Sequence, residues 1–248
     1  MGGSARDRTL AILGFHKIGA PSSGAEPSWW YVPEDPFVGY LEFLRENGWE
    51  VIGLSAFLRG LAAPESLPER SALLTFDDGY RSIREVALPW LLRFGYPAVL
   101  FVPTGFIGGQ NDFDAGIEPQ ESICDWNDLR ELERAGVSVQ SHGISHRRLS
   151  WLDVAEQEQE VVASKTILEQ TLGKPVHVFA HPYGDEGADP GALRELLKRA
   201  GYRAACLYGG GPNPLPISDP YRLARLAMGP DSDLDEMLRQ CEKPSDGH

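Results

Sequence analysis

The sequence predicts an α/β fold in which parallel strands and helices alternate to form a (β/α) barrel. Strand-type and helix-type patterns follow one another along most of the chain, which is typical of βαβ units. Residues 98–102 are a continuous apolar run, as expected for a parallel strand buried on both faces. A chain of 248 residues with 42% hydrophobic residues can bury one substantial core. We therefore expect one domain over residues 1–248, with its core at about 9–228.

The N-terminal elements lead from a buried strand into a long loop. Residues 10–15 form the first expected strand, which ends at His16. The loop at 20–35 is rich in Pro, Ser and Gly and carries three consecutive aromatic residues at 29–31. These aromatic side chains either stack on sugar rings or plug one end of the barrel. The next expected elements are a helix at 36–48, a strand at 51–54 and a short helix at 55–61.

Asp77 and Asp78 stand where an apolar strand at 73–76 ends, and Gly79 follows them. Adjacent carboxylates repel one another, and burial disfavours ionising both unless a cation or several donors compensate. Neighbouring side chains on a strand point to opposite faces, so the two aspartates share a site only if the strand breaks there, as Gly79 permits. The pattern indicates a metal site. The alternative is an ordinary turn in which one aspartate caps the next helix.

Two histidines follow a second strand pattern at 137–141. His142 and His146 are four residues apart, and Gly143 and Ser145 between them allow the backbone to curl and present both imidazoles to one point. Two neutral imidazoles and one carboxylate make a three-ligand site with open positions, which suits a catalytic metal better than a structural one.

The rest of the chain continues the alternation of helices and strands. The helix at 153–173 is the longest, and we expect its Glu156, Glu158 and Glu160 to form a solvated face. The loop at 103–122 leaves the barrel at the same end as the aspartates and is a candidate wall of the substrate groove. The other expected elements are helices at 81–94, 125–136, 191–200 and 234–242, strands at 176–180, 203–207 and 222–226, and an irregular loop at 209–216.

Three motifs of this chain, in this order, resemble those of the NodB-type polysaccharide deacetylases, carbohydrate esterase family 4. They are TFDDGY at 75–80, SHGISH at 141–146 and FAHPYG at 179–184. The resemblance begins near Leu10 and fades after about Leu226. It implies a distorted (β/α) barrel and a metal-dependent amide hydrolase that removes an acetyl group from an N-acetylated amino sugar, so the expected partner is a carbohydrate substrate.

The resemblance also implies a role for each motif residue. Asp78, His142 and His146 would hold the metal, for which zinc is the first expectation and cobalt, nickel or iron(II) are alternatives. Asp77 would accept the proton of the attacking water. The backbone N–H of Tyr183 would donate to the developing oxyanion, and Pro182 and His181 would belong to the same oxyanion and substrate site.

The chain departs from the family pattern in three places. The family usually has an arginine two places before Pro182, which orients the catalytic aspartate, but this chain has Ala180. The late catalytic histidine is missing and the fourth motif is not recognisable. His16 opens a His-x-Ile segment that resembles a subset of the family in which this early histidine is the catalytic acid; alternatively, it stacks under the aromatic loop. His181 is a second proton donor, a substrate contact or simply a packed histidine.

The amino-acid composition limits the possible binding partners and the cellular location. The formal charge of −13 argues against nucleic acid, because phosphate contacts need a basic surface. The three cysteines form no disulfide or zinc pattern, which fits reducing surroundings. No run approaches the roughly 20 apolar residues of a membrane span, and no signal-peptide pattern is present. We expect a cytoplasmic protein as written, or an extracytoplasmic one if a signal peptide was removed. No feature of the sequence indicates an oligomeric state.

Two other functions compete with the deacetylase. One is a hydrolase of a small cyclic amide or ureide on the same scaffold, which predicts a closed pocket where a glycan enzyme needs an open groove. The other is a non-catalytic carbohydrate-binding relic, suggested by the missing arginine and late histidine. The relic predicts sugar affinity without turnover and without a metal.

Overall fold

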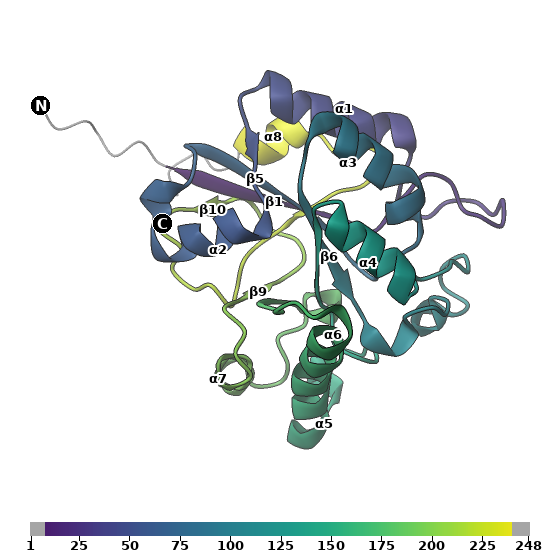
Figure 1. The fold of residues 1–248 in the computed structure, drawn as a ribbon, viewed down its shortest axis with the longest axis vertical. Helices are drawn as coiled ribbons and strands as arrows, with labels where there is room; N and C mark the ends of the chain where they lie inside the picture. The colour runs from purple at the N-terminus through teal and green to yellow at the C-terminus, as the bar shows by residue number, and fades with distance from the viewer. Residues whose placement is uncertain (1–7, 240–248) are drawn as a thin grey trace, which may run out of the picture.

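The computed structural model describes residues 8–239 and contains one strongly curved sheet with helices around it (Figure 1). Its neighbouring strands run in the order β10-β1-β5-β6-β7-β8-β9, while β11 pairs with β1 and β4 with β5. A separate two-stranded sheet joins β2 to β3. The strands are β1 (Thr9–Phe15), β2 (Lys17–Ile18), β3 (Tyr31–Val32), β4 (Glu50–Val51), β5 (Arg70–Phe76), β6 (Ala98–Val102), β7 (Val137–Ser141), β8 (Val178–Ala180), β9 (Ala204–Cys206), β10 (Asn213–Pro214) and β11 (Leu226–Ala227).

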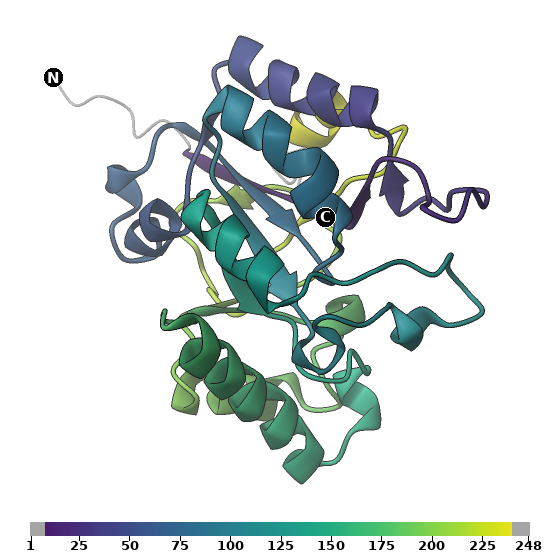
Figure 2. The same ribbon diagram turned by 45° about the vertical axis from the view of Figure 1, so that its right-hand side comes forward.

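The helices lie outside the sheet, as Figure 2 shows from a second direction. They are α1 (Glu34–Glu46), α2 (Leu54–Ala62), α3 (Leu88–Phe94), α4 (Trp126–Arg134), α5 (Val154–Glu158), α6 (Ser164–Leu172), α7 (Pro190–Arg199) and α8 (Leu234–Arg239). π-helical turns at Ile83–Ala87 and Gln159–Ala163 precede α3 and join α5 to α6. No helix within residues 8–239 is long and apolar enough to cross a membrane.

The sheet closes on itself through a short, irregular segment. β1 pairs in parallel with β5 on one side and with β11 on the other. A parallel bridge between Cys206 and Leu223 links the same C-terminal segment to β9, the last strand of the path. The chain therefore forms a distorted (β/α) barrel, and the predicted fold class is confirmed.

Some element boundaries differ from the expectation. The loop at 209–216 contains β10, which pairs antiparallel with β1. The Asn213 side chain stabilises this pairing because it exchanges hydrogen bonds with the backbone of Ala224, at 2.8 and 3.0 Å. The strand expected at 51–54 ends at Val51, because Gly53 is already the N-cap of α2. The last three residues of the helix expected at 234–242 lie outside the described residues.

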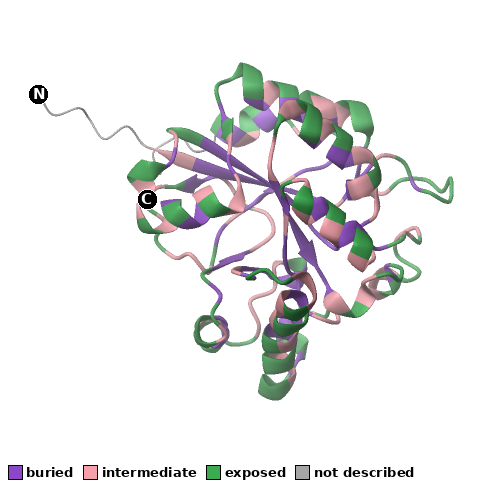
Figure 3. Cartoon of the chain, in the orientation of Figure 1, coloured by how far each residue is buried: buried purple, intermediate pink, exposed green. Residues whose placement is uncertain are grey.

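The central strands are mostly buried (Figure 3), and burial on both faces explains the continuous apolar runs of β5 and β6. Along β1, Leu10 and Ile12 belong to a cluster inside the barrel, while Ala11, Leu13 and Phe15 pack toward the surrounding helices. Residues of α2 complete the interior cluster at the amino end of the strands. The amino end of the barrel interior is therefore a packed core, and the carboxyl end of the strands is left for polar groups.

Candidate active site

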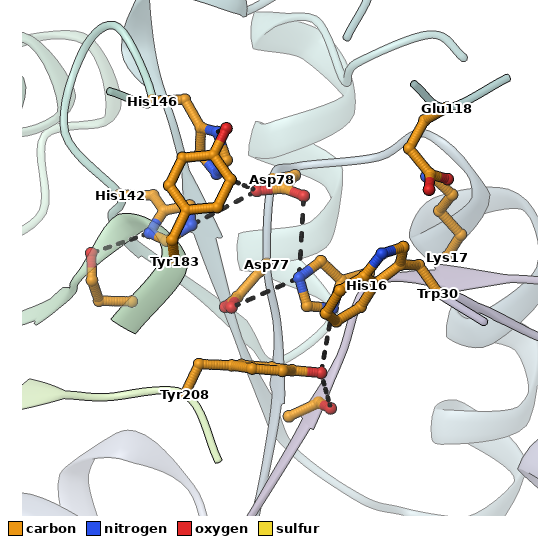
Figure 4. Close-up of polar contacts among 12 residues, drawn as sticks. His16, Lys17, Trp30, Asp77, Asp78, Glu118, His142, His146, Tyr183 and Tyr208 are labelled. Carbon is orange, nitrogen blue, oxygen red and sulfur yellow. Dashed lines mark hydrogen bonds and ion pairs between the residues drawn. The ribbon is translucent and has the colours of Figure 1, made fainter. Parts of the chain in front are cut away.

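Four polar residues continue the inward-facing register of neighbouring segments: three directly follow the carboxyl ends of β1, β5 and β7, and Arg225 directly precedes β11. His16 follows Leu10 and Ile12 at steps of two, and Asp77 follows Leu73 in the same way. His142 extends the inward face of β7, and Arg225 extends that of Leu223. Because side chains alternate along a strand, all four point to the same end of the barrel. They converge there in one site, of which Figure 4 shows His16, Asp77 and His142 in close-up.

A tight turn brings both aspartates into this site. β5 ends at Phe76, and Asp78 and Gly79 adopt positive φ angles of 67° and 73°. A β-carbon at Gly79 would lie 3.0 Å from a methyl carbon of Val102, so a larger residue would clash as well as strain the backbone. The strand breaks where the sequence required it to break. As a result, Asp77 and Asp78 line one cavity of about 200 Å³.

Asp78, His142 and His146 form a buried group of potential metal ligands. One ligand atom from each lies within 4.8 Å of the others. The Nε2 atoms of His142 and His146 are 3.4 and 3.1 Å from Oδ1 of Asp78 (Figure 4). The three residues that the sequence proposed as ligands are thus neighbours in space.

The hydrogen bonds around these three candidate ligands leave lone pairs that could bind a cation. Nδ1 of His142 donates to the carbonyl oxygen of Ala180 at 2.8 Å, because a carbonyl can only accept, and this leaves a lone pair on Nε2. Asp78 Oδ1 is buried and has no hydrogen-bond partner within the described chain. Lone pairs that face one another in a buried site repel unless a cation lies between them. Two imidazoles and a carboxylate with room for further ligands suit a divalent catalytic metal.

Glu160 fixes the loop between the two histidines, and here the expectation of a solvated face was wrong. Its carboxylate is buried and accepts hydrogen bonds from the backbone N–H of Ile144 at 2.6 Å and of Ser145 at 3.0 Å, and from the Ser145 hydroxyl at 2.5 Å. Gly143 makes the close approach feasible, because a β-carbon there would lie 2.7 Å from the carboxylate. Glu158, by contrast, is exposed as expected.

Arg225 is the partner of Asp77. The two side chains are fully buried and form a bidentate pair, with N–O distances of 2.6 and 2.7 Å. Nε of Arg225 also donates to the carbonyl oxygen of Leu207 at 2.6 Å. Burial is the largest single effect and raises the pKa of Asp77, but the charge and hydrogen bonds of Arg225, together with the two nearby histidines, outweigh burial and hold the pKa below its usual 3.8. A guanidinium from the closing segment thus contacts the aspartate in a chain that has Ala180 at the family's arginine position.

His16 contacts both aspartates and the aromatic loop. Its Nε2 lies 4.0 Å from a carboxylate oxygen of each aspartate. Its ring packs against Trp30 at a centroid distance of 4.6 Å, and its Nδ1 lies 3.5 Å from the Tyr208 hydroxyl. Burial lowers the pKa of His16, and the aspartates oppose this effect only in part. His16 therefore stacks against the aromatic loop, as one alternative expected, and also lies beside both aspartates, while its role as the catalytic acid stays a prediction.

Of the third motif, Tyr183 lines the cavity and His181 does not. Tyr183 has a φ of 58°, lines the cavity, and has its hydroxyl 3.2 Å from Nδ1 of His146. Its backbone N–H donates no hydrogen bond to another described residue. Pro182 and His181 are buried and do not line the cavity. Neither ring nitrogen of His181 has a partner in the described chain, and its position matches the packed histidine among the alternatives.

Loops from two parts of the chain form the cavity's outer wall. Figure 2 shows the purple and teal loops around 20–30 and 105–120 projecting from the same end of the barrel. A buried ion pair of 2.9 Å between Lys17 and Glu118 joins them, and Ser28 donates to the same carboxylate. The expected groove wall therefore lines the cavity, through Ile117 and Glu118 among others. Ile117 and Tyr183 are exposed at its rim, so the cavity opens to the surface.

Residues 65–205 match the polysaccharide deacetylase family over more than half of the chain. The chain belongs to this family. Among the relatives of this polysaccharide deacetylase family member, YxkH of Bacillus subtilis is 26% identical over 175 residues, which cover 71% of this chain and 57% of YxkH. The poly-β-1,6-N-acetyl-D-glucosamine N-deacetylase of Escherichia coli is 26% identical over 193 residues, covering 64% of this chain and 28% of that enzyme. The chain thus spans only part of each relative.

Solved structures support the fold of this family member. The Streptococcus pyogenes deacetylase PplD, in complex with acetate, superposes with a TM-score of 0.79 at 22% identity, over 96% of this chain and 100% of PplD. IcaB from Ammonifex degensii gives a TM-score of 0.76 at 23% identity, over 91% and 94% of the two chains. This chain therefore shares its distorted barrel fold with both proteins.

Proposed function

We propose that this single domain is a metal-dependent hydrolase that removes an acetyl group from an N-acetylated amino sugar of a polysaccharide. The observation that carries the proposal is the meeting of two units in one open cavity. One is the buried cluster of Asp78, His142 and His146, and the other is the pair of Asp77 and Arg225. The name of the Escherichia coli relative makes poly-β-1,6-N-acetylglucosamine the first substrate to test.

Asp78, His142 and His146 would hold the metal, with zinc as the first candidate and cobalt, nickel or iron(II) as alternatives. When bound, such a cation supplies polarisation of the acetyl carbonyl and a lower pKa for water. The chain's own contribution is to aim two Nε2 lone pairs and one carboxylate oxygen at a common point. The carbonyl of Ala180 and the hydroxyl of Tyr183 orient the two rings from behind.

Asp77 acts as the general base in this proposal. Its pairing with Arg225 keeps the carboxylate ionised at neutral pH and fixes its orientation. The bidentate contact occupies both oxygens, but each carboxylate oxygen has a second lone pair that can accept the proton of the attacking water. Arg225 therefore holds Asp77 in place without blocking its function.

His16 and Tyr183 have the two remaining roles in the proposed reaction, one at the departing amine and the other at the oxyanion. His16 lies next to both aspartates and would protonate the departing amine, which is a poor leaving group without that proton. Tyr183 lines the cavity, and its backbone N–H, which donates to no other described residue, would stabilise the developing oxyanion there.

Specific observations weigh against the two competing functions. The cavity has an exposed rim, whereas a cyclic amide or ureide hydrolase would enclose its small substrate. A binding relic has no need of a buried and fully paired carboxylate, and Arg225 supplies the contact whose apparent loss suggested a relic. The proposed partner is therefore an extended carbohydrate, and the acidic net charge of −13 disfavours nucleic acid.

The test is acetate release by the zinc-loaded protein from β-1,6-linked and β-1,4-linked N-acetylglucosamine oligomers. A cyclic ureide serves as the competing substrate. We expect release from at least one oligomer series, its loss in Asp77→Asn, and normal rates in the matched exposed variant Glu158→Gln. Ureide hydrolysis without acetate release would replace the proposal with the competing hydrolase.

A further inference from the structure

Two exposed aromatic side chains, one at the rim of the cavity and one outside it, contact the same arginine. Tyr183 is 45% exposed and lines the cavity, while Trp151 is 72% exposed. Trp151 ends the short turn Leu149–Trp151, just after the histidine loop. Tryptophan is rarely so exposed in a folded protein, and an exposed apolar surface beside an active site is typical of a binding surface.

Arg148 connects the two rings. Its guanidinium carbon lies 4.7 Å from the centroid of the Tyr183 ring and 5.9 Å from that of Trp151. Both aromatic side chains are therefore within 6 Å of one cationic group. Within residues 8–239, the guanidinium of Arg148 contacts these two rings and makes no hydrogen bond or ion pair, so its N–H donors are available to a ligand.

The turn that carries Trp151 is held firmly against the turn that carries Tyr183. The Ser150 hydroxyl donates to Asp185 at 2.5 Å and so ties the two turns together. Nε2 of Gln157 donates to the carbonyl oxygen of Leu149 at 2.9 Å and fixes the turn to α5. The surface of Trp151, Arg148 and Tyr183 is thus prearranged, which reduces the entropy cost of binding.

This surface matches the chemistry of a pyranose ring. Such a ring presents C–H groups on its faces and hydroxyls around its edge. The face of an indole offers a flat apolar area with a negative quadrupole for the C–H groups, and the free donors of Arg148 suit the hydroxyls. Since Tyr183 belongs to both the cavity and this surface, a sugar chain with one unit in the cavity would continue over it.

We propose that Trp151 and Arg148 form a subsite for a further sugar unit of the substrate, outside the cavity where the acetyl group is removed. The identity of the sugar rests on the proposed function. The subsite makes the enzyme select a polymer over a single sugar, because the energy of stacking is gained only when the chain extends beyond the cavity.

The test is binding of a β-1,6-linked N-acetylglucosamine hexamer, measured by calorimetry in an Asp77→Asn background that prevents turnover. We expect Trp151→Ala to weaken binding about tenfold, as for an aromatic residue at a binding hot spot. Trp151→Phe keeps most of the stacking and should bind nearly as well as the background protein. Leu92→Ala removes a similarly exposed apolar side chain from α3 and should change nothing.

Kinetics with Asp77 intact separate this inference from the proposed function. Trp151→Ala should raise KM for the hexamer about tenfold, with kcat and the hydrolysis of 4-nitrophenyl acetate unchanged. Equal hexamer binding with and without Trp151, or no hexamer binding at all, would overturn the subsite. Binding that depends on Trp151 in a protein that releases no acetate would keep the subsite and refute the deacetylase. An unfolding midpoint equal to that of the parent protein with the same residue at position 77 confirms that each Trp151 variant and the Leu92 variant is folded.

Discussion

Replacing Arg225 by methionine should destabilise the protein strongly, because it leaves a carboxylate without its partner in the barrel interior. Arg225 and Asp77 are at most 2% exposed, and two charge-assisted hydrogen bonds of 2.6 and 2.7 Å join them. Removing one partner of a buried ion pair typically costs about 3–5 kcal/mol. We expect a loss of that size in the free energy of unfolding for Arg225→Met, since methionine fills much of the volume but none of the charge.

The assay is urea unfolding followed by circular dichroism at pH 7, on metal-free protein so that metal binding does not contribute. The pKa of Asp77 lies below 3.8, so the pair is intact at pH 7 and is lost only as pH falls through that lower value. Asp77→Asn alone should also destabilise, because it leaves the Arg225 guanidinium unpaired.

The double variant tests whether the two side chains stabilise the protein as a pair. Combining Arg225→Met with Asp77→Asn removes both charges, so the total loss should be smaller than the sum of the single losses by at least about 2 kcal/mol. Losses that add within about 0.5 kcal/mol would refute the reasoning. So would a loss below about 1 kcal/mol for Arg225→Met alone.

Three further predictions concern other parts of the site. His16→Gln should lower kcat on an N-acetyl sugar about 10²–10⁴-fold but spare 4-nitrophenyl acetate, whose leaving group needs no proton; equal losses would contradict the acid role. Glu160→Gln should weaken zinc affinity about 10–100-fold in a chelator competition, whereas Glu158→Gln should not, and equal affinities would exclude a positioning role for Glu160. Burial lowers the pKa of His181 from 6.5 to about 4, so folding stability should fall as pH drops below 6.5, by about 2 kcal/mol at pH 5. His181→Phe should remove this loss in urea titrations at pH 7 and 5, and identical losses in both proteins would count against it.

The barrel and the candidate ligands could be predicted because their signals are local. A buried strand that ends in two carboxylates and a glycine already specifies a turn, and Asp78 and Gly79 adopt the positive φ angles that this turn needs. His142 and His146 stand four residues apart at another strand end, and parallel strands present such ends on one edge. These segments carry their geometry in a few consecutive residues.

Arg225 was missed because nothing near it in the sequence marks its role. It lies 148 residues from Asp77 and beside a strand of only two residues, so long-range register decides where it points. The available signal was the position of Arg225 inside the expected closing strand at 222–226. Because side chains alternate along a strand, Arg225 faces the same side as Leu223, which would have predicted a cation in the barrel interior.

Glu160 was misassigned because its burial depends on an irregular helix. The charge pattern of the segment predicts a solvated face for an ideal α-helix, but a π-helical turn at Gln159–Ala163 adds a residue to the turn and changes which side chains face inward. π-helical turns have no simple sequence pattern and often occur at functional sites. Propensity and charge patterns alone could not reveal this contact.

Metal content measured together with acetate release tests the central claim most directly. Elemental analysis of purified wild type, Asp78→Ala, His142→Ala and the control Glu158→Gln should be paired with acetate release from N-acetylglucosamine oligomers by the same samples. We predict about one divalent metal per chain in wild type and control, and loss of both metal and activity in the two ligand variants. A wild-type protein that stays metal-free after incubation with zinc, cobalt and nickel, or ligand variants that keep full activity, would contradict the account.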